Sequence, residues 1–289
     1  MKPWSFSGDL VNFLTEDGLE LSGMLCGKGD TVFVQIHGLT GSLEGYDYYR
    51  IKEMCLEKGL AYFGFNNRGS GVIKSFNSYK SGKGECVTVG ASLEIFEDCV
   101  KDIDAALLFL ETKGFKKFIL SGHSTGCQKV AYYQSQKKNK RVKALFLSGP
   151  LDDRQYQRKI LGEKFSETVE TAKKFVEEGK GNHFVPEDFR ASFFTYNRYY
   201  NMYKENSSEG LLDPDRNFKE LGKIDCPIFS ILGNKDEYLT MDARTILEKI
   251  KRAYKNKKSK TFLIEGANHG FEGKENQLTG AISSCLDLL

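Results

Sequence analysis

One serine of the chain stands between two glycines, directly after a short apolar run. Residues 119–128 read ILSGHSTGCQ, so Gly122, Ser124 and Gly126 fit the pattern Gly-x-Ser-x-Gly. A serine hydroxyl can attack a carbonyl carbon when a base removes its proton and an acid orients that base. Because the pattern is short and recurs by chance, the remaining parts of such a site must also be found in the chain.

The base must be a histidine, and the chain has four of them: His37, His123, His183 and His269. Where such a serine sits between a strand and a helix, the acid and then the histidine follow it in the sequence. His37 and His123 precede the serine. We expect His37 to hold its own loop and His123 to point away from the serine. We expect His183 at the surface of a helical insertion. His269, in the loop GANHGF after the last predicted strand, is therefore the expected base.

The acid should follow the strand that precedes this histidine loop. The segment ILGNKDEYL offers Asp236 and Glu237, and the turn at Gly233-Asn234 can direct Asp236 inward, so Asp236 is the preferred candidate. Asp152 and Asp153, which follow the strand before that one, are the alternatives.

A tetrahedral intermediate also needs two backbone N–H donors for its oxyanion. One should be the N–H of Thr125, the residue after the serine. The other should come from the loop HGLTG that begins at His37, where the N–H of Leu39 is preferred and that of Gly38 is the alternative.

The elements that must position these residues alternate along the chain. Short runs of apolar and β-branched residues predict strands at 32–36, 60–65, 118–120, 142–147, 227–232 and 261–264. Helical spacing predicts helices at 44–58, 93–110, 124–136, from about 240, and at 275–289. This order indicates an α/β fold with a mostly parallel, doubly wound sheet, whose sites lie at the carboxyl ends of the strands. Residues 10–14 and 19–26 flank Asp17-Gly18 and predict an antiparallel hairpin at the edge.

The alternation stops between residues 151 and 221, where the pattern is helical. We therefore expect a core domain made of residues 1–150 and 222–289, with a helical cap insertion at 151–221. Aromatic residues are dense between 183 and 203, and most of them should pack the cap. Some should line a substrate pocket, since the cap covers the cleft; the candidates are Phe193, Phe194, Tyr196 and Tyr200.

The composition excludes several other classes of protein. A net charge of +3 over 289 residues argues against a nucleic-acid binder. The seven scattered cysteines suit a reducing compartment, and there is neither a signal peptide nor a run long enough to span a membrane. We expect a cytoplasmic protein. No His, Cys and carboxylate cluster has metal-ligand spacing, so no cofactor or metal is predicted.

The segments HGLTG, NNRGSG, GHSTG, GNKDEY and GANHGF occur in this order, and together they resemble the α/β-hydrolase superfamily, serine esterase branch. The resemblance covers almost the entire chain. The longer run GHSTGCQ is similar to a group of fungal and plant members that includes siderophore-ester hydrolases. The resemblance implies hydrolysis of a small-molecule carboxylic ester with Ser124 as nucleophile, His269 as base and Asp236 as acid.

Several alternatives use the same residues. Thioesters, lactones and small peptides can be cleaved by the same chemistry. An acyltransferase would pass the acyl group to an alcohol in place of water. A non-catalytic ligand receptor on the same fold is an alternative of a different class, and some receptors keep an intact triad.

Overall fold

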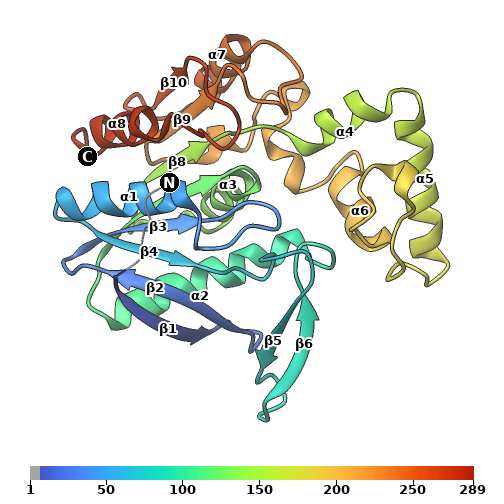
Figure 1. Cartoon of the computed structure of the whole chain (residues 1–289), viewed down its shortest axis with the longest axis horizontal. Helices are drawn as coiled ribbons and strands as arrows, with labels where there is room; N and C mark the ends of the chain where they lie inside the picture. The colour runs from blue at the N-terminus through green and yellow to red at the C-terminus, as the bar shows by residue number, and fades with distance from the viewer. Residues whose placement is uncertain (1–6) are drawn as a thin grey trace.

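The computed structural model describes residues 7–289, and its centre is an eight-stranded sheet of order β1-β2-β4-β3-β7-β8-β9-β10 (Figure 1). The strands are β1 (Asp9–Leu14), β2 (Glu20–Cys26), β3 (Thr31–Ile36), β4 (Ala61–Phe65), β7 (Lys117–His123), β8 (Val142–Ser148), β9 (Ile228–Gly233) and β10 (Lys260–Ile264). Strand β2 is antiparallel to both β1 and β4, and the pairings from β4 to β10 are parallel. The expected mostly parallel sheet with an antiparallel edge hairpin is thus confirmed.

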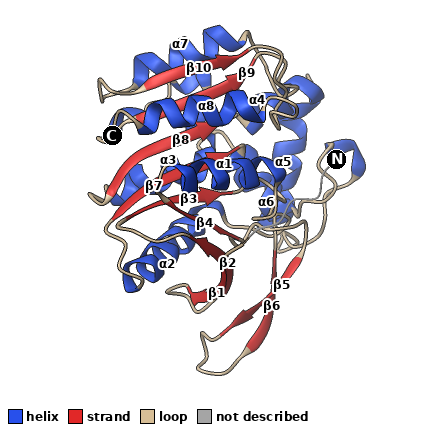
Figure 2. Cartoon of the chain, turned by 60° about the vertical axis from the view of Figure 1, so that its left-hand side comes forward, coloured by secondary structure: helices blue, strands red, loops and turns tan. Residues whose placement is uncertain are grey.

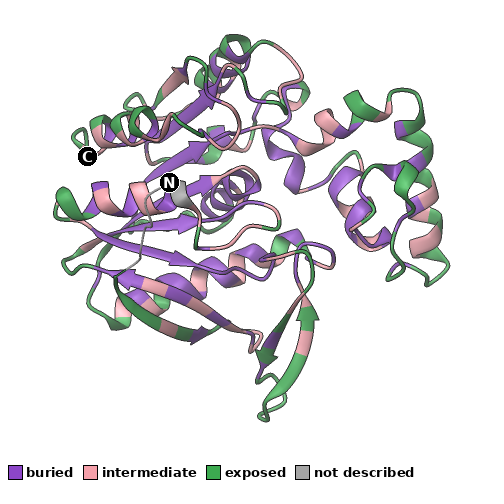
Figure 3. Ribbon diagram, in the orientation of Figure 1, coloured by how far each residue is buried: buried purple, intermediate pink, exposed green. Residues whose placement is uncertain are grey.

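Helices cover both faces of the sheet because successive strand residues point to opposite sides. Helices α1 (Tyr46–Glu57) and α8 (Glu275–Leu286) share one core cluster with Phe33 and Phe146, and Figure 2 shows both lying across the near face. Helices α2 (Cys99–Thr112), α3 (Thr125–Lys137) and α7 (Ala243–Ala253) share the other cluster with Val32, Val34 and Leu145. The central strands are accordingly buried along their length (Figure 3).

Residues 151–221, which we call the insertion, lie between β8 and β9. They form α4 (Asp153–Leu161), α5 (Lys164–Glu177), α6 (Tyr196–Tyr203) and short 3-10 turns, and in the described chain they add no strand to the sheet. In Figure 1 the insertion lies beyond the carboxyl ends of β3 and β8. This edge is where the fold places its sites.

A buried cluster of four charges joins the insertion to the sheet domain. Arg198 of α6 donates two hydrogen bonds to Glu209, at 2.6 and 2.8 Å, and lies 3.7 Å from Glu94. Lys129 of α3 donates to Glu94 at 2.5 Å and to the side-chain oxygen of Asn67 at 3.1 Å. Since buried charges are tolerated only when paired, this cluster contributes to holding the insertion against α3.

The structure contains one element that the sequence did not predict. Strands β5 (Lys74–Ser78) and β6 (Glu85–Val89) form a separate antiparallel pair that projects below the main sheet in Figure 1. Five of their ten residues are exposed and only Phe76 and Ser78 are buried, and their sequences lack the regular apolar alternation that marks a half-buried strand. The predicted helix at 93–110 also begins later, at Cys99, after a 3-10 turn at Phe96–Asp98.

Candidate active site

Ser124 lies in a strained turn between β7 and α3. Its φ is 55° and its ψ is −128°, a region that side chains other than glycine rarely occupy. The flanking glycines allow the turn, since a Cβ on Gly122 would lie 2.1 Å from the carbonyl oxygen of Gly126, and a Cβ on Gly126 would lie 2.4 Å from that of Ile36. The Ser124 N–H donates to Ser148 at the end of β8, at 3.0 Å. This is the geometry of a nucleophile elbow.

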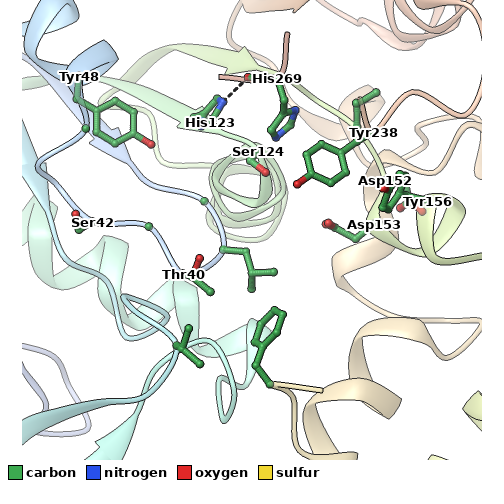
Figure 4. Close-up of a pocket in the computed structure, with 18 residues that line it drawn as sticks. Thr40, Ser42, Tyr48, His123, Ser124, Asp152, Asp153, Tyr156, Tyr238 and His269 are labelled. Carbon is green, nitrogen blue, oxygen red and sulfur yellow. Dashed lines mark hydrogen bonds between the residues drawn. The ribbon is translucent and has the colours of Figure 1, made fainter. Parts of the chain in front are cut away.

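His269 and Asp236 form a hydrogen-bonded pair beside this turn. The distance from His269 Nδ1 to Asp236 Oδ2 is 2.7 Å, and the Asp236 side chain is fully buried. The other Asp236 oxygen accepts the N–H of Tyr238 at 2.9 Å. In Figure 4 the imidazole points toward Ser124. No His269–Ser124 hydrogen bond is found in residues 7–289, and such bonds often tighten only when substrate is bound.

Three neighbours hold the His269 loop in place. Glu237 accepts the backbone N–H of His269 at 3.0 Å, so its carboxylate binds the main chain and not the ring. The Tyr238 ring stands edge-on to the His269 ring, with centroids 4.7 Å apart. His123 Nε2 lies 2.8 Å from the His269 carbonyl oxygen (Figure 4). We expected His123 to point away from the nucleophile; its ring is bonded to the His269 backbone, and the residue also lines the cleft.

Asp152 and Asp153, the alternative acids, are directed elsewhere. Asp152 is the N-cap of α4 and accepts the N–H of Gln155 at 2.8 Å. Asp153 accepts from the Gln128 side chain at 3.1 Å. In the described chain neither carboxylate is hydrogen-bonded to His269. Burial is the largest influence on both groups and raises the pKa of each to about 7.

A buried histidine fixes the expected oxyanion loop. The N–H of Asn67 donates to His37 Nε2 at 3.1 Å, so the proton of this neutral ring is on Nδ1, which donates to the Gly38 carbonyl oxygen at 2.8 Å. Burial, followed by the nearby Lys129 charge, lowers the pKa of His37 to about 3. In a trans peptide the carbonyl of Gly38 and the N–H of Leu39 point in opposite directions, so this bond turns the Leu39 N–H away from His37.

The same loop lies directly against the serine. A Cβ on Gly38 would be 2.8 Å from Ser124 Cβ, so only glycine allows this approach. Thr125 is the first residue of α3, and the N–H groups of a first turn have no acceptor within their own helix. The N–H groups of Leu39 and Thr125 are therefore suited to an oxygen bound beside Ser124.

The site opens into a cleft of about 600 Å³. Its walls come from the loop that follows β3, the segments that follow β7, β8, β9 and β10, and the insertion. They include Leu39, Ser42, Tyr48, His123, Ser124, Asp152, Asp153, Tyr156, Phe193, Tyr238 and His269. A second hollow of about 650 Å³ shares five of these residues, namely Leu39, Asp153, Tyr156, Phe193 and Tyr238, and continues beneath the insertion.

The structure separates the four aromatic residues expected in the pocket. Phe193 lines both hollows, and Phe194 lines the second. Tyr196 stacks on Phe175 with centroids 4.2 Å apart, and Tyr200 packs against the same aromatic cluster of the insertion. Neither tyrosine lines the two hollows, because both pack within the insertion.

Two other tyrosines take these places in the cleft. Tyr156 and Tyr238 line both hollows, and their rings meet edge to face at 4.8 Å. The sequence held a signal for both tyrosines, since each lies within eight residues after the carboxyl end of a strand.

In residues 7–289, no group of three or more His, Cys, Asp or Glu side chains is placed to hold a metal ion. No described helix is long and apolar enough to cross a bilayer.

The fold is that of the α/β-hydrolase superfamily, as comparison with solved structures shows. Est1E from Butyrivibrio proteoclasticus, solved with ferulic acid bound, aligns with a TM-score of 0.65 at 17% identity, over 95% of this chain and 97% of its own. Mouse alpha/beta hydrolase domain-containing protein 10 aligns at 0.64 and 19% identity, over 96% and 98%. A soluble variant of monoglyceride lipase from Saccharomyces cerevisiae, in complex with a substrate analog, aligns at 0.64 and 17% identity, over 99% and 97%.

The chain belongs to the family described as "Protein of unknown function (DUF1749)", whose model matches residues 91–285. No curated protein sequence matches the chain. The matched residues include Ser124, Asp236 and His269 but not the Leu39 loop.

Proposed function

We propose that this protein hydrolyses carboxylic esters through an acyl-enzyme intermediate. The observation that carries the proposal is the strained Ser124 turn, which shares one cleft with the His269–Asp236 pair. A serine, a histidine and a buried carboxylate in this order and arrangement are the parts of a nucleophilic triad.

In the first half-reaction Ser124 Oγ attacks the ester carbonyl carbon, and His269 Nε2 takes the hydroxyl proton. Asp236 accepts the hydrogen bond from Nδ1, which holds the ring in the tautomer with a free Nε2 and stabilises the imidazolium. The N–H groups of Leu39 and Thr125 bind the oxyanion. The imidazolium then gives its proton to the departing alcohol, and the acyl group stays on Ser124.

In the second half-reaction a water molecule replaces the alcohol. His269 removes a proton from the water as it attacks the acyl carbon, the oxyanion forms again, and the proton passes to Ser124 as the acid product leaves. Tyr156, Phe193 and Tyr238 line the cleft and offer apolar contacts to one side of the ester. An aromatic acid such as the ferulic acid bound in Est1E is therefore a suitable first substrate class to assay.

The test is covalent labelling combined with turnover. A fluorophosphonate should label Ser124, and Ser124→Ala should lose both the label and hydrolysis of chromogenic acyl esters. Ser42 lines the same cleft, so Ser42→Ala is the matched control and should still be labelled. An adduct on another serine would contradict the assignment.

The same assay separates the alternatives. Steady release of product over many turnovers supports a hydrolase, whereas one product per protein molecule would favour a receptor. Transfer of the acyl group to an added alcohol in preference to water would favour an acyltransferase. A panel of ester, thioester and lactone substrates with one shared acyl group tests which bond is preferred.

We further propose that residues 151–221 act as a cap on a core domain formed by 1–150 and 222–289. Phe193 and Tyr156 of this segment line the cleft, and Arg198 holds it to the core domain through Glu94. All seven cysteines are free thiols, which suits the cytosol, where thiols stay reduced.

A further inference from the structure

One carboxyl group of the cleft has no cationic partner. Asp153 is the first residue of α4 and lines both hollows. Figure 4 shows it near Tyr238 and Tyr156. In the described chain its side chain forms no ion pair, and it accepts a hydrogen bond from the neutral Gln128 amide at 3.1 Å. A carboxylate in such a place is costly unless a positive charge or further donors meet it.

The nearest buried cations are already neutralised. Arg198 gives two short hydrogen bonds to Glu209, and Lys129 binds Glu94. These two cations and two anions balance, so the cluster has no positive charge left for Asp153. The pKa of Asp153 agrees with this, because burial and then the Glu209 charge raise it to about 7, although Arg198 and His269 act in the opposite direction.

Aromatic rings stand beside this carboxyl group. Tyr156, Phe193 and Tyr238 line both hollows together with Asp153, and the Tyr156 and Tyr238 rings are 4.8 Å apart. Ring faces attract cations, and quaternary ammonium groups in particular are held by clusters of rings. A carboxylate that shares a hollow with three rings is a combination suited to a soft organic cation.

We propose that Asp153, Tyr156, Phe193 and Tyr238 form a subsite that binds an ammonium-type cation carried by the ester substrate. This inference rests on the proposed ester hydrolysis, and it names the substrate class. The cation supplies the charge that Asp153 lacks, while the ester carbonyl reaches Ser124 in the same cleft.

None of the other ionisable groups around Asp153 in the described chain forms an ion pair with its carboxylate. They are Asp152 at the N-cap of α4, Arg154 and Tyr156 on α4, Arg198 and Tyr203 on α6, Glu209 after α6, Asp236 and Tyr238 after β9, His269 after β10, and Cys127 on α3. Arg154 donates to the Tyr203 carbonyl oxygen. Arg190 lines only the second hollow and is exposed, so it lies at the outer end of the cleft.

The test compares esters that differ only in charge. Choline esters are paired with carbon isosteres in which a tert-butyl group replaces trimethylammonium, and a second pair carries the same change on the acyl side. For at least one pair we expect kcat/KM to favour the cation by about tenfold or more, mainly through KM. Because the anionic form of Asp153 binds the cation, this preference should rise as the pH increases through about 7.

Asp153→Asn keeps an acceptor for Gln128 but removes the charge. We expect it to abolish most of the cation preference, measured as the ratio of kcat/KM within each pair, because the lost charge acts on only one member of the pair. Asp188 is an exposed aspartate of the same insertion that does not line the cleft, so Asp188→Asn is the control for a change in net charge. A preference that Asp153→Asn leaves intact, or an equal loss on both esters, would overturn the subsite.

Binding measured without turnover separates this inference from the proposed function. Ser124→Ala protein is titrated calorimetrically with the choline ester and with its carbon isostere, in both the Asp153 and the Asp153→Asn background. Tighter binding of the cation that depends on Asp153 supports the subsite even if no ester is hydrolysed. Equal binding of the two compounds by a correctly folded protein overturns it, even if neutral esters are cleaved. If Asp153→Asn fails to fold, competitive inhibition of wild-type hydrolysis by choline, but not by its carbon isostere, decides the question.

Discussion

Gly149 and His269 come so close that a Cβ added to the glycine would stand 3.0 Å from the imidazole Cε1 atom. Gly149 follows β8, and its φ is +69°, so the backbone conformation and the space both require glycine. The carboxyl end of β8 therefore forms one wall of the space in which the imidazole ring lies.

Gly149→Ala should accordingly lower kcat by about tenfold or more, since small misplacements of a reacting group are costly. Gly179 provides a matched control, because its φ is +76° and nothing lies within 4 Å of its added Cβ. Both variants should lose about 1–2 kcal/mol of unfolding free energy from the left-handed backbone, but only Gly149→Ala should lose turnover. The measurements are urea denaturation and kcat on one chromogenic ester. Equal activity in the two variants would show that His269 tolerates displacement.

Asp236→Asn should reduce kcat by up to about 10⁴-fold, because the ring loses the partner of its Nδ1–H and its imidazolium loses the stabilising charge. The relevant contact is the 2.7 Å hydrogen bond to His269. Asp152→Asn and Asp153→Asn, assayed on a neutral ester, are the controls and should change kcat much less. If one of them produced the large loss while Asp236→Asn stayed active, the acid would lie after β8.

Phe193 and Tyr196 should respond differently to truncation. Tyr196 is buried in the aromatic cluster of the insertion and stacks on Phe175, so Tyr196→Ala should cost about 3 kcal/mol or more of stability. Phe193 lines the cleft, so Phe193→Ala should mainly change the ratio of activities on an aromatic and a short aliphatic ester. Melting temperature and this ratio are measured for both. Unfolding of Phe193→Ala with an unchanged ratio would place Phe193 in the core of the insertion.

Asp153 should make the stability of the protein depend on pH. Its pKa is raised from 3.8 to about 7 in the folded protein, so the folded state binds a proton more tightly than the unfolded state. The stability of the folded state with Asp153 protonated is therefore fully present below about pH 4, and it is lost as the pH rises through about 7. Asp153→Asn should therefore be more stable than the wild type at pH 8, by about 1 kcal/mol or more, and the difference should shrink toward pH 4.

Urea denaturation of both proteins at several pH values measures this difference, with Asp188→Asn as the control at an exposed position. A gain in stability on removing a charge from a cleft is typical of a residue kept for function. A wild type that is the more stable protein at pH 8 would mean that Asp153 is satisfied within the fold.

Local pattern was enough to predict the order of the elements. Alternating apolar runs and helical spacing predicted the sheet strands and the main helices, and the resemblance of five short segments indicated the superfamily. The parallel sheet then brings Leu39, Ser124, Asp236 and His269 to one edge, since the carboxyl ends of its strands meet there. For this reason the sequence alone could name residues more than 200 positions apart as members of one site.

Only the tertiary structure decided which side chains face the cleft. Tyr196 and Tyr200 belong to the same aromatic-rich segment as Phe193, but on α6 they pack into the aromatic cluster of the insertion. Tyr156 of α4 and Tyr238 of the loop after β9 line the cleft instead. The pairing of Arg198 with Glu209, which leaves Asp153 without a cation, also joins residues that local periodicity does not relate. Side-chain direction and burial depend on contacts between distant elements, and these contacts exist only once the chain has folded.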